Sequence, residues 1–199
     1  MQRILALAVV VTSAACGPKP AAREASLAFS SNEEDECSQT LAVAHSAGVV
    51  RLEWTSRGEA RLIVQEASHD VAVTKSSNRV ETVVSCTEAV FVGNAHPAPH
   101  GTRLVFDRVR TDWHWSGAAR TARSGPARAA KLQVSCRAAR AGTECSAVGV
   151  PDAVPLPTST PWRFGRHLEV QRTAWIVDTR YDDRPLDAAE LASIRRCFP

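Results

Sequence analysis

Residues 50–65 read VRLEWTSRGEARLIVQ, two alternating stretches on either side of a short polar turn. Apolar residues occupy every second position of each stretch: Val50, Leu52, Trp54, Ala60, Leu62 and Val64. Successive side chains of a strand point to opposite faces, so this alternation predicts two strands with one apolar and one mostly polar face. Gly58 ends a turn of the kind that joins neighbouring strands. The stretch therefore predicts an antiparallel hairpin that packs one face on a core.

The rest of the chain has a similar strand-and-turn pattern. Short β-branched and aromatic stretches are separated by Gly, Pro, Ser and Asn, which is typical of β-proteins. Further strands are predicted at 26–30, 40–46, 71–75, 80–92, 103–116, 131–136, 144–150 and 167–177. We expect an all-β, mainly antiparallel fold, either a β-sandwich or a partly closed barrel.

The stretch 103–116 changes phase. Leu104 and Phe106 place apolar side chains on even positions, whereas Val109, Trp113 and Trp115 place them on odd ones. The slip near residues 107–108 predicts a β-bulge or a strand that passes from one sheet to another. Two loops are predicted, at 93–101 and at the proline-rich 151–161.

A short C-terminal helix is the one helix that the sequence predicts. Asp187 and Glu190 have the spacing of a capping box, and basic residues follow at the other end, where they suit the helix dipole. Leu191, Ile194 and Phe198 recur at helical spacing and predict an apolar stripe that faces the sheet. Cys197 lies near this stripe, so a disulfide is a second means of holding the helix in place.

The N-terminus has the pattern of an export signal. Arg3 precedes an apolar run at residues 4–11, and Ser13-Ala14-Ala15-Cys16 follows. The run is far shorter than the ~20 residues that a membrane-spanning helix needs. Small residues after such a run are typical of a signal-peptide cleavage site. We therefore expect residues 1–15 to be removed.

This arrangement resembles the lipobox of bacterial lipoproteins, although Ser13 stands where a branched apolar residue is usual. The resemblance covers residues 1–16 and implies that Cys16 is diacylated and becomes the mature N-terminus. Gly17, rather than aspartate, implies sorting to the outer membrane, facing the periplasm. The alternative is ordinary cleavage after Ala15 and release of a soluble periplasmic protein. The expected organisation is a signal peptide (1–15), a lipidated cysteine with a flexible tether (16–26) and a single β-rich periplasmic domain (27–199).

The cysteines agree with export to an oxidising compartment. If Cys16 is lipidated, five cysteines remain and one thiol is left over; if it is not, six cysteines allow three disulfides. Cys136 and Cys145 are the favoured pair, because Gly142 lets two strands return side by side. Cys37 with Cys86 is the next choice. No Cys-x-x-Cys spacing is present, and no metal or other cofactor is predicted.

Charge and aromatic residues mark one candidate face for a ligand or partner. Residues 103–140 carry nine cationic side chains and two acidic ones. Trp113 and Trp115 share a strand face, with Arg108 and Arg110 nearby, and paired tryptophans form either a recognition platform or part of a core. Nucleic acid is a poor candidate partner, because no nucleic-acid-binding motif is present in this exported chain.

No catalytic motif stands out. Ser68-His69-Asp70 has the residue types of a hydrolase triad, but neighbours on a strand point to opposite faces and do not assemble by themselves. The sequence favours a lipid-anchored, non-catalytic binding or accessory module for an envelope protein or glycan. The alternative is an envelope hydrolase whose site is assembled from distant residues such as His69, His100 or His114.

Overall fold

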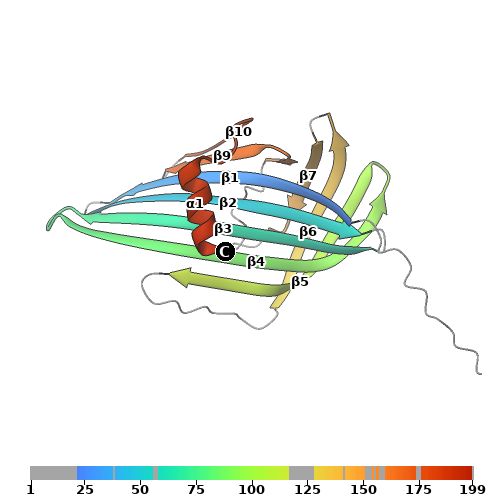
Figure 1. Ribbon diagram of the computed structural model, residues 1–199, viewed down its shortest axis with the longest axis horizontal. Coiled ribbons are helices and arrows are strands. Elements are labelled where there is room, and N and C mark those ends of the chain that lie inside the picture. Colours follow the sequence, from blue (N-terminus) through green and yellow to red (C-terminus); the bar gives the residue numbers. More distant parts are fainter. Residues whose placement is uncertain are drawn as a thin grey trace, which may run out of the picture.

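The structure is a computed structural model that describes residues 22–37, 39–55, 58–116, 128–140, 142–150, 154, 156, 160–173 and 176–198; for Ala22, Arg128, Ala130 and residues 110–116 it describes the backbone alone. These residues form one curled sheet and one helix (Figure 1). The elements are β1 (Ala22–Glu36), β2 (Thr40–Thr55), β3 (Glu59–Thr74), β4 (Arg79–Ala98), β5 (Gly101–Ser116), β6 (Arg128–Ala139), β7 (Gly142–Val148), β8 (Trp162–Phe164), β9 (His167–Thr173), β10 (Val177–Asp182) and α1 (Ala188–Cys197).

The ten strands follow the order β10-β9-β1-β2-β3-β4-β5-β6-β7-β8. Every neighbouring pair is antiparallel except β1 and β9, which are parallel. The fold is therefore mainly β with one short C-terminal helix, as the sequence predicts. Of the two expected architectures, the partly closed barrel is the one that forms.

The hairpin of residues 50–65 lies in the middle of this sheet. Val50 pairs with Val64 and Leu52 with Leu62 across β2 and β3, so one apolar face is continuous over both strands. These side chains join one core inside the curl, and we call the side of the sheet that bears them the inner face. Its largest fully buried members are Trp162, Phe29, Phe91, Phe106, Phe164, Leu27, Leu52, Leu62, Leu104, Leu132, Leu168 and Val50.

The two ends of the sheet meet through the link between β8 and β9. Only Gly165 and Arg166 separate these strands, although β8 pairs with β7 and β9 pairs with β1. The Gly165 N–H donates to the Ser26 carbonyl oxygen at 2.7 Å. The Tyr181 hydroxyl on β10 donates to the Pro161 carbonyl oxygen at 2.6 Å and accepts from the Arg163 N–H at 3.1 Å. These contacts make the curled sheet a half-barrel.

The phase slip of the 103–116 stretch is a bulge. The register of β5 shifts between Phe106 and Arg108 against β6. The register of β4 against β5 shifts between Val90 and Phe91 and again between Val92 and Gly93. At this point the Gly93 backbone lies against Val105, where an added Cβ would be 1.9 Å from the Val105 carbonyl oxygen. The bulge keeps Leu104 and Phe106 in the core and Val109 packed against it, although they lie on either side of the phase slip.

Several boundaries differ from the predicted ones. β1 begins at Ala22, earlier than the expected end of the tether at residue 26. The predicted loop at 93–101 is wrong: β4 continues to Ala98 and β5 starts at Gly101, so only Pro99 and His100 form the turn. Part of the predicted loop at 151–161 lies outside the described residues. The glycines and prolines of 93–101 predict a loop, but the β4–β5 ladder runs through them from Gly93 to Ala98.

Four strands extend past the core at one end of the sheet, which we call the tip (left in Figure 1). The tip comprises residues 34–36 of β1, 40–45 of β2, 69–74 of β3 and 79–84 of β4. Within the described residues, β5 pairs with β4 only from Ser85 onward and β9 pairs with β1 only as far as Glu34. The tip is therefore a four-stranded sheet with both faces outside the core, at the end opposite to Ala22.

The helix lies on the outer face of the sheet, across the middle of β1–β4 (Figure 1). The predicted capping box is present: the Asp187 carboxylate accepts from the Glu190 N–H, and the Glu190 carboxylate accepts from the Asp187 N–H. The predicted apolar stripe is only partly present: Ile194 and Phe198 are half-buried, whereas Leu191 is 38% exposed and the buried residue of the helix is Glu190. Burial of an acidic side chain means that this helix is held by polar contacts.

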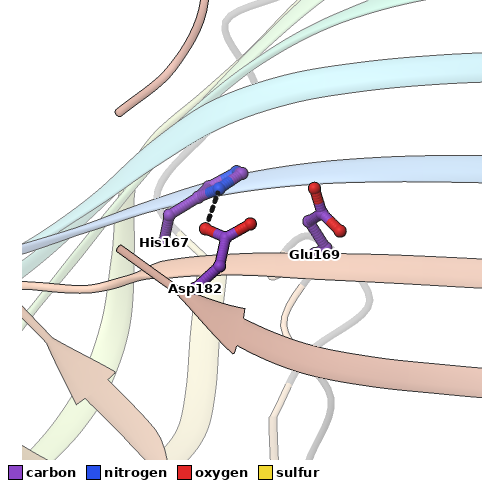
Figure 2. A group of neighbouring side chains, drawn as sticks. All are labelled: His167, Glu169 and Asp182. Atoms are coloured by element: carbon purple, nitrogen blue, oxygen red, sulfur yellow. Dashed lines mark hydrogen bonds and ion pairs between the residues drawn. The ribbon is translucent and has the colours of Figure 1, made fainter. Parts of the chain in front are cut away.

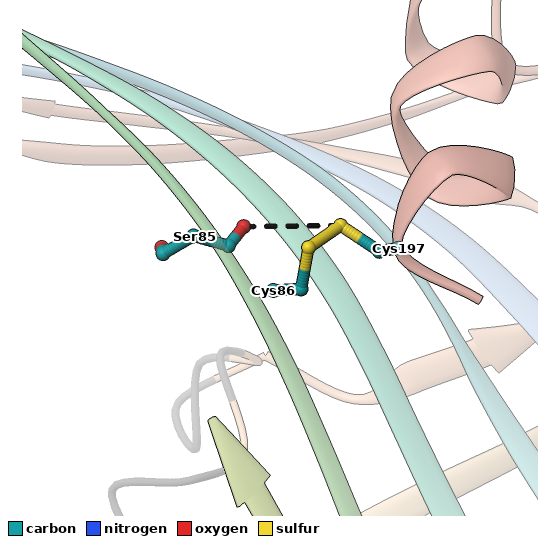
Figure 3. Close-up of a disulfide and its surroundings, with 3 residues drawn as sticks. All are labelled: Ser85, Cys86 and Cys197. Atoms are coloured by element: carbon teal, nitrogen blue, oxygen red, sulfur yellow. Dashed lines mark hydrogen bonds between the residues drawn. A yellow bond between two sulfur atoms is a disulfide. The ribbon is translucent and has the colours of Figure 1, made fainter. Parts of the chain in front are cut away.

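Two disulfides tie the sheet together. Cys136 and Cys145, the pair that the sequence favours, join the neighbouring strands β6 and β7. The second choice of Cys37 with Cys86 is wrong, since Cys86 on the outer face of β4 is bonded to Cys197 of α1 and Cys37 is a free, exposed thiol (Figure 3). The disulfide that the sequence predicts between Cys197 and the sheet is therefore present, with Cys86 as the partner.

The two disulfides should contribute unequally to stability. Replacing Cys86 and Cys197 together with Ser opens a loop of 111 residues, whereas replacing Cys136 and Cys145 opens one of 9. The chain-entropy argument gives a loss of about 5 kcal/mol for the first pair and about 3 kcal/mol for the second. Urea denaturation followed by tryptophan fluorescence measures both. Non-reducing peptide mapping that finds Cys37 joined to Cys86 would contradict the assignment.

Candidate functional site

Polar side chains form a buried network on the outer face, beneath the first turn of α1. Ser30, His167 and Glu190 are each no more than 3% exposed. Burial of polar groups is costly unless each has a partner. The register brings the group together, because Ala28 of β1 and Asp182 of β10 both lie opposite His167 of β9. Residues more than a hundred positions apart in the sequence therefore meet.

The imidazole of His167 joins a serine to a carboxylate. Its Nδ1 lies 2.9 Å from Asp182 Oδ1, as Figure 2 shows, and its Nε2 lies 3.1 Å from Ser30 Oγ. With the proton on Nδ1, the ring donates to Asp182 and accepts from the Ser30 hydroxyl. The order of groups is serine, histidine and aspartate.

Arg184 completes the network from the segment between β10 and α1. Its guanidinium donates to both Glu190 carboxylate oxygens, at 3.0 and 3.2 Å, and to Glu169 at 3.0 Å. It also donates to Ser30 Oγ at 3.1 Å. The hydrogen bonds to Glu190 and then to Glu169 raise the pKa of Arg184, and burial opposes them only in part. Arg184 is thus the cation that neutralises the buried Glu190.

The other carboxylates stay ionised for the same reason. Burial alone would raise the pKa of Asp182, but hydrogen bonds from His167 and Arg184 and the charge of Arg184 outweigh it and hold the pKa below its ordinary value. Burial likewise opposes ionisation of Glu169, and hydrogen bonds from Arg180 and Arg184 prevail to lower its pKa. The network is therefore a set of ion pairs at neutral pH.

His167, Glu169 and Asp182 also have the ligand types of a metal site, with one ligand atom of each within 4.8 Å of the others (Figure 2). Each of these atoms already has a protein partner: Ser30 and Asp182 for His167, and Arg180 and Arg184 for Glu169. A divalent cation would have to displace the Arg184 guanidinium. We draw no metal site from this cluster.

The order Ser30, His167 and Asp182 also resembles the catalytic triad of a hydrolase. Whether it can act as one depends on whether a substrate reaches the Ser30 hydroxyl. Ser30 is 2% exposed, and Arg184 donates to its hydroxyl oxygen. A pocket of about 320 Å³ beside the network is lined by His167 and Arg184 and does not include Ser30. The Ser30 hydroxyl is therefore covered in this arrangement, and the contacts of the group are those of a structural network.

The Ser68-His69-Asp70 triplet does not form a site. Ser68 and Asp70 lie on the inner face and are hydrogen-bonded to each other, whereas His69 lies on the outer face opposite His45 of β2. Alternation along β3 separates the histidine from the other two residues, as the sequence predicts. His100 lies exposed in the β4–β5 turn.

The predicted partner face is only partly within the described side chains. Arg108 is exposed and lies 3.4 Å from the Asp107 carboxylate. Arg110, Trp113, His114 and Trp115 lie on β5, whose backbone pairs Trp115 with Cys86, but their side chains are outside the described part. Cys16 also lies outside it.

Sequence reasoning missed Ser30, His167 and Arg184. No local spacing marks them, because Ser30 and His167 are 137 residues apart and meet through a parallel strand pair. The capping box at Asp187 was the one available signal, since it fixes where Glu190 points.

A second chemically distinct area lies on the outer face at the tip. We call its five aliphatic side chains the apolar strip: Leu41, Val43, Val71, Val73 and Val80. Leu41 is 39%, Val43 40% and Val80 61% exposed. Next to the strip, a pocket of about 290 Å³ opens between α1 and the sheet, lined among others by His45, His69, Asp187, Ser193 and Arg196. The two areas are continuous because His45 follows Val43 on the same face.

Comparison with protein families, characterised proteins and solved structures finds no match for this chain. Within the described ranges, no helix is both long and apolar enough to cross a membrane.

Arg184→Met should lower the free energy of unfolding by about 2–3 kcal/mol, because it leaves the buried Glu190 charge unpaired. This is below the full cost of breaking a buried pair, since the Arg184 side chain is 35% exposed whereas that of Glu190 is 2% exposed. Arg180→Met is the matched control. The native Arg180 side chain also binds Glu169 but is 73% exposed, so its replacement should lower the free energy of unfolding by less than about 1 kcal/mol. Thermal and urea unfolding measure both.

The difference in unfolding free energy between wild type and Arg184→Met should decrease as the pH falls. Asp182 and Glu169 have lowered pKa values in the folded state, so their contribution is present above the unfolded pKa of about 4 and is lost as the pH falls through the folded values. The gap between wild type and Arg184→Met should therefore narrow in acid. Equal stability of the Arg184 and Arg180 variants at neutral pH would contradict the network.

Proposed function

We propose that this protein is a lipid-anchored envelope protein whose half-barrel is a non-catalytic binding module for a protein partner. The observation that carries the proposal is the apolar strip, an aliphatic surface at the far end of a sheet that has already left its core. Contiguous exposed apolar patches on folded proteins mark interaction sites. Extending four strands beyond the core has no packing benefit within the described part of the chain.

The cysteines support the lipid anchor. Four of the six form the two disulfides and leave Cys16 and Cys37. The strand between Ala22 and Cys37 covers about 45–50 Å at ~3.3 Å per residue. The six residues from Cys16 to Ala22 reach at most about 22 Å when fully extended. This difference in reach argues against a disulfide between Cys16 and Cys37 in the same molecule, and so supports the lipidated form over the three-disulfide alternative.

The proposed anchor and the strip lie at opposite ends of the sheet. The chain enters β1 at Ala22, and the tip begins at Glu34 of the same strand. A protein held by Cys16 on the periplasmic side of the outer membrane would present the tip away from that membrane. This placement suits capture of an envelope component, and the lack of aromatic residues in the strip favours a protein over a glycan, because sugar rings are commonly bound on aromatic faces.

Processing tests the anchor directly. Mature protein from its native host should begin at Cys16 and carry acyl chains, and Cys16→Ser protein should leave the membrane fraction, because stable anchoring needs two or more chains. Intact-mass analysis and fractionation measure this. A Cys16→Ser variant that remains membrane-bound with a mass altered only by the substitution would remove the lipoprotein proposal, and so would a mature chain that begins elsewhere.

An envelope hydrolase is the second candidate, and the Ser30–His167–Asp182 arrangement is the observation that favours it. Ser30 would be the nucleophile and His167 its base. Burial of Ser30 beneath Arg184 opposes this function.

A fluorophosphonate probe separates the two candidates. Native protein should remain unlabelled at Ser30, because the hydroxyl is covered. Arg184→Met is the control that uncovers Ser30 while keeping His167 and Asp182. Labelling of native protein that is lost in Ser30→Ala and His167→Ala would establish the hydrolase and overturn the non-catalytic function.

A further inference from the structure

We propose that the outer face of the tip docks a cationic, amphipathic segment of a partner protein, with apolar side chains on the apolar strip and Lys or Arg side chains at its acidic border. The inference rests on the proposed function and adds the chemistry of the partner and the place where it binds.

The strip is one-sided. The outer-face positions of β2 and β4 at the tip include Leu41, Val43 and Val80. The residue that follows each of these along its strand points to the inner face, and these residues are Ala42, Ala44 and Glu81. Val83 is the one inner-face valine of the tip strand β4, and it is 38% exposed. An apolar outer face beside a mixed inner face predicts that a partner covers one side of the tip only.

The border of the strip is acidic. Glu34 and Glu36 lie on the outer face beside the strip, whereas the four other carboxylates of residues 33–45 and 68–83 lie on the inner face. Lys75 pairs with Glu36. Glu34, on the outer face opposite Val43, has no cation partner among the described side chains. The surface thus complements a partner that combines apolar and positive side chains.

The neighbouring pocket supplies a polar end to this surface. It lies where α1 meets the sheet, beyond His45 and His69, and Asp187, Ser193 and Arg196 line it. A segment laid along the strip would reach this pocket and place one polar side chain there. Because the pocket lies at one end of the strip, the two together set the direction in which the bound segment runs. The strip alone would not set this direction.

Two other occupants fit less well. An anionic lipid surface would be repelled by Glu34 and the neighbouring carboxylates. A second copy that packed the same face on itself would bring Glu34 and Glu36 of each copy close to the same acidic border. A cationic protein segment is the occupant that both the apolar and the acidic parts favour.

The test uses a labelled peptide of about 18 residues, five helical turns, with Leu on one face and Lys on the other. Its counterpart has Glu in place of every Lys. Fluorescence anisotropy measures the affinity of each for the native protein. The Lys peptide should bind at least about tenfold more tightly than the Glu peptide, and the difference should shrink at high salt.

Variants locate the site. Val43→Ser with Val80→Ser should weaken binding of the Lys peptide by about tenfold, because two apolar contacts are lost. Val83→Ser, on the inner face of the same strand, is the matched control and should change it by less than about twofold. Glu34→Gln with Glu36→Gln should weaken binding at low salt only, whereas Glu33→Gln with Asp35→Asn, which lie on the inner face of β1, should not. Unchanged melting transitions show that each variant is folded.

Several results would overturn the proposal. Equal affinity for both peptides is one, and equal effects of inner-face and outer-face variants on binding is another. Binding to vesicles of phosphatidylethanolamine and phosphatidylglycerol that the strip variants abolish would identify a lipid surface as the occupant. A dimer in sedimentation velocity that the strip variants dissociate would identify a second copy. These are distinct from failure of the proposed function. An envelope partner that is cross-linked equally well by wild type and the strip variants would leave the binding module standing and remove this surface.

Discussion

The parallel pairing of β9 with β1 is the constraint on which the rest of the structure depends. It returns the chain to the first strand after the sheet has run from β1 to β8, and so curls the sheet around one core. The same pairing places His167 beside Ser30 and, through β10, positions Arg184 to receive Glu190 of the helix. Closure of the half-barrel and attachment of α1 are therefore consequences of one strand pair. A parallel pair between segments this distant in sequence is slow to form but closes the largest loop of the fold.

Local patterns in the sequence were sufficient where a single strand or helix carries its own signal. The hairpin around Leu52 and Leu62, the bulge after Phe106 and the capping box of Asp187 all follow from spacing over a few residues. The prediction for α1 placed Leu191 on the buried face and missed Glu190, because Glu190 is held by Arg184, which lies outside the helix. Apolar periodicity has no means of predicting that a glutamate is the buried residue of a helix.

Long-range features left no trace in the sequence for a similar reason. Cys86 had several possible partners, and only the position of α1 over β4 selects Cys197. The tip segments 40–46, 71–75 and 80–92 were predicted as strands, but the first two as separate ones. Their continuity with the hairpin strands was missed, because Gly48 of β2 and the polar residues Glu66, Ser68 and Asp70 of β3 interrupt the apolar alternation. The apolar strip is made of valines that, read along the chain, are ordinary strand residues. It becomes a candidate site only once the register shows that they share one uncovered face.

The central claim is that a partner covers the outer face of the tip in the intact envelope and leaves the inner face exposed. Hydroxyl-radical footprinting of the lipidated protein in isolated envelopes, compared with the purified protein, measures this residue by residue. The account predicts that Leu41, Val43 and Val80 lose oxidation in the envelope while Val83 on the opposite face keeps it. Equal oxidation of all four side chains in both samples, or protection of Val83 with continued oxidation of Val80, would contradict the account.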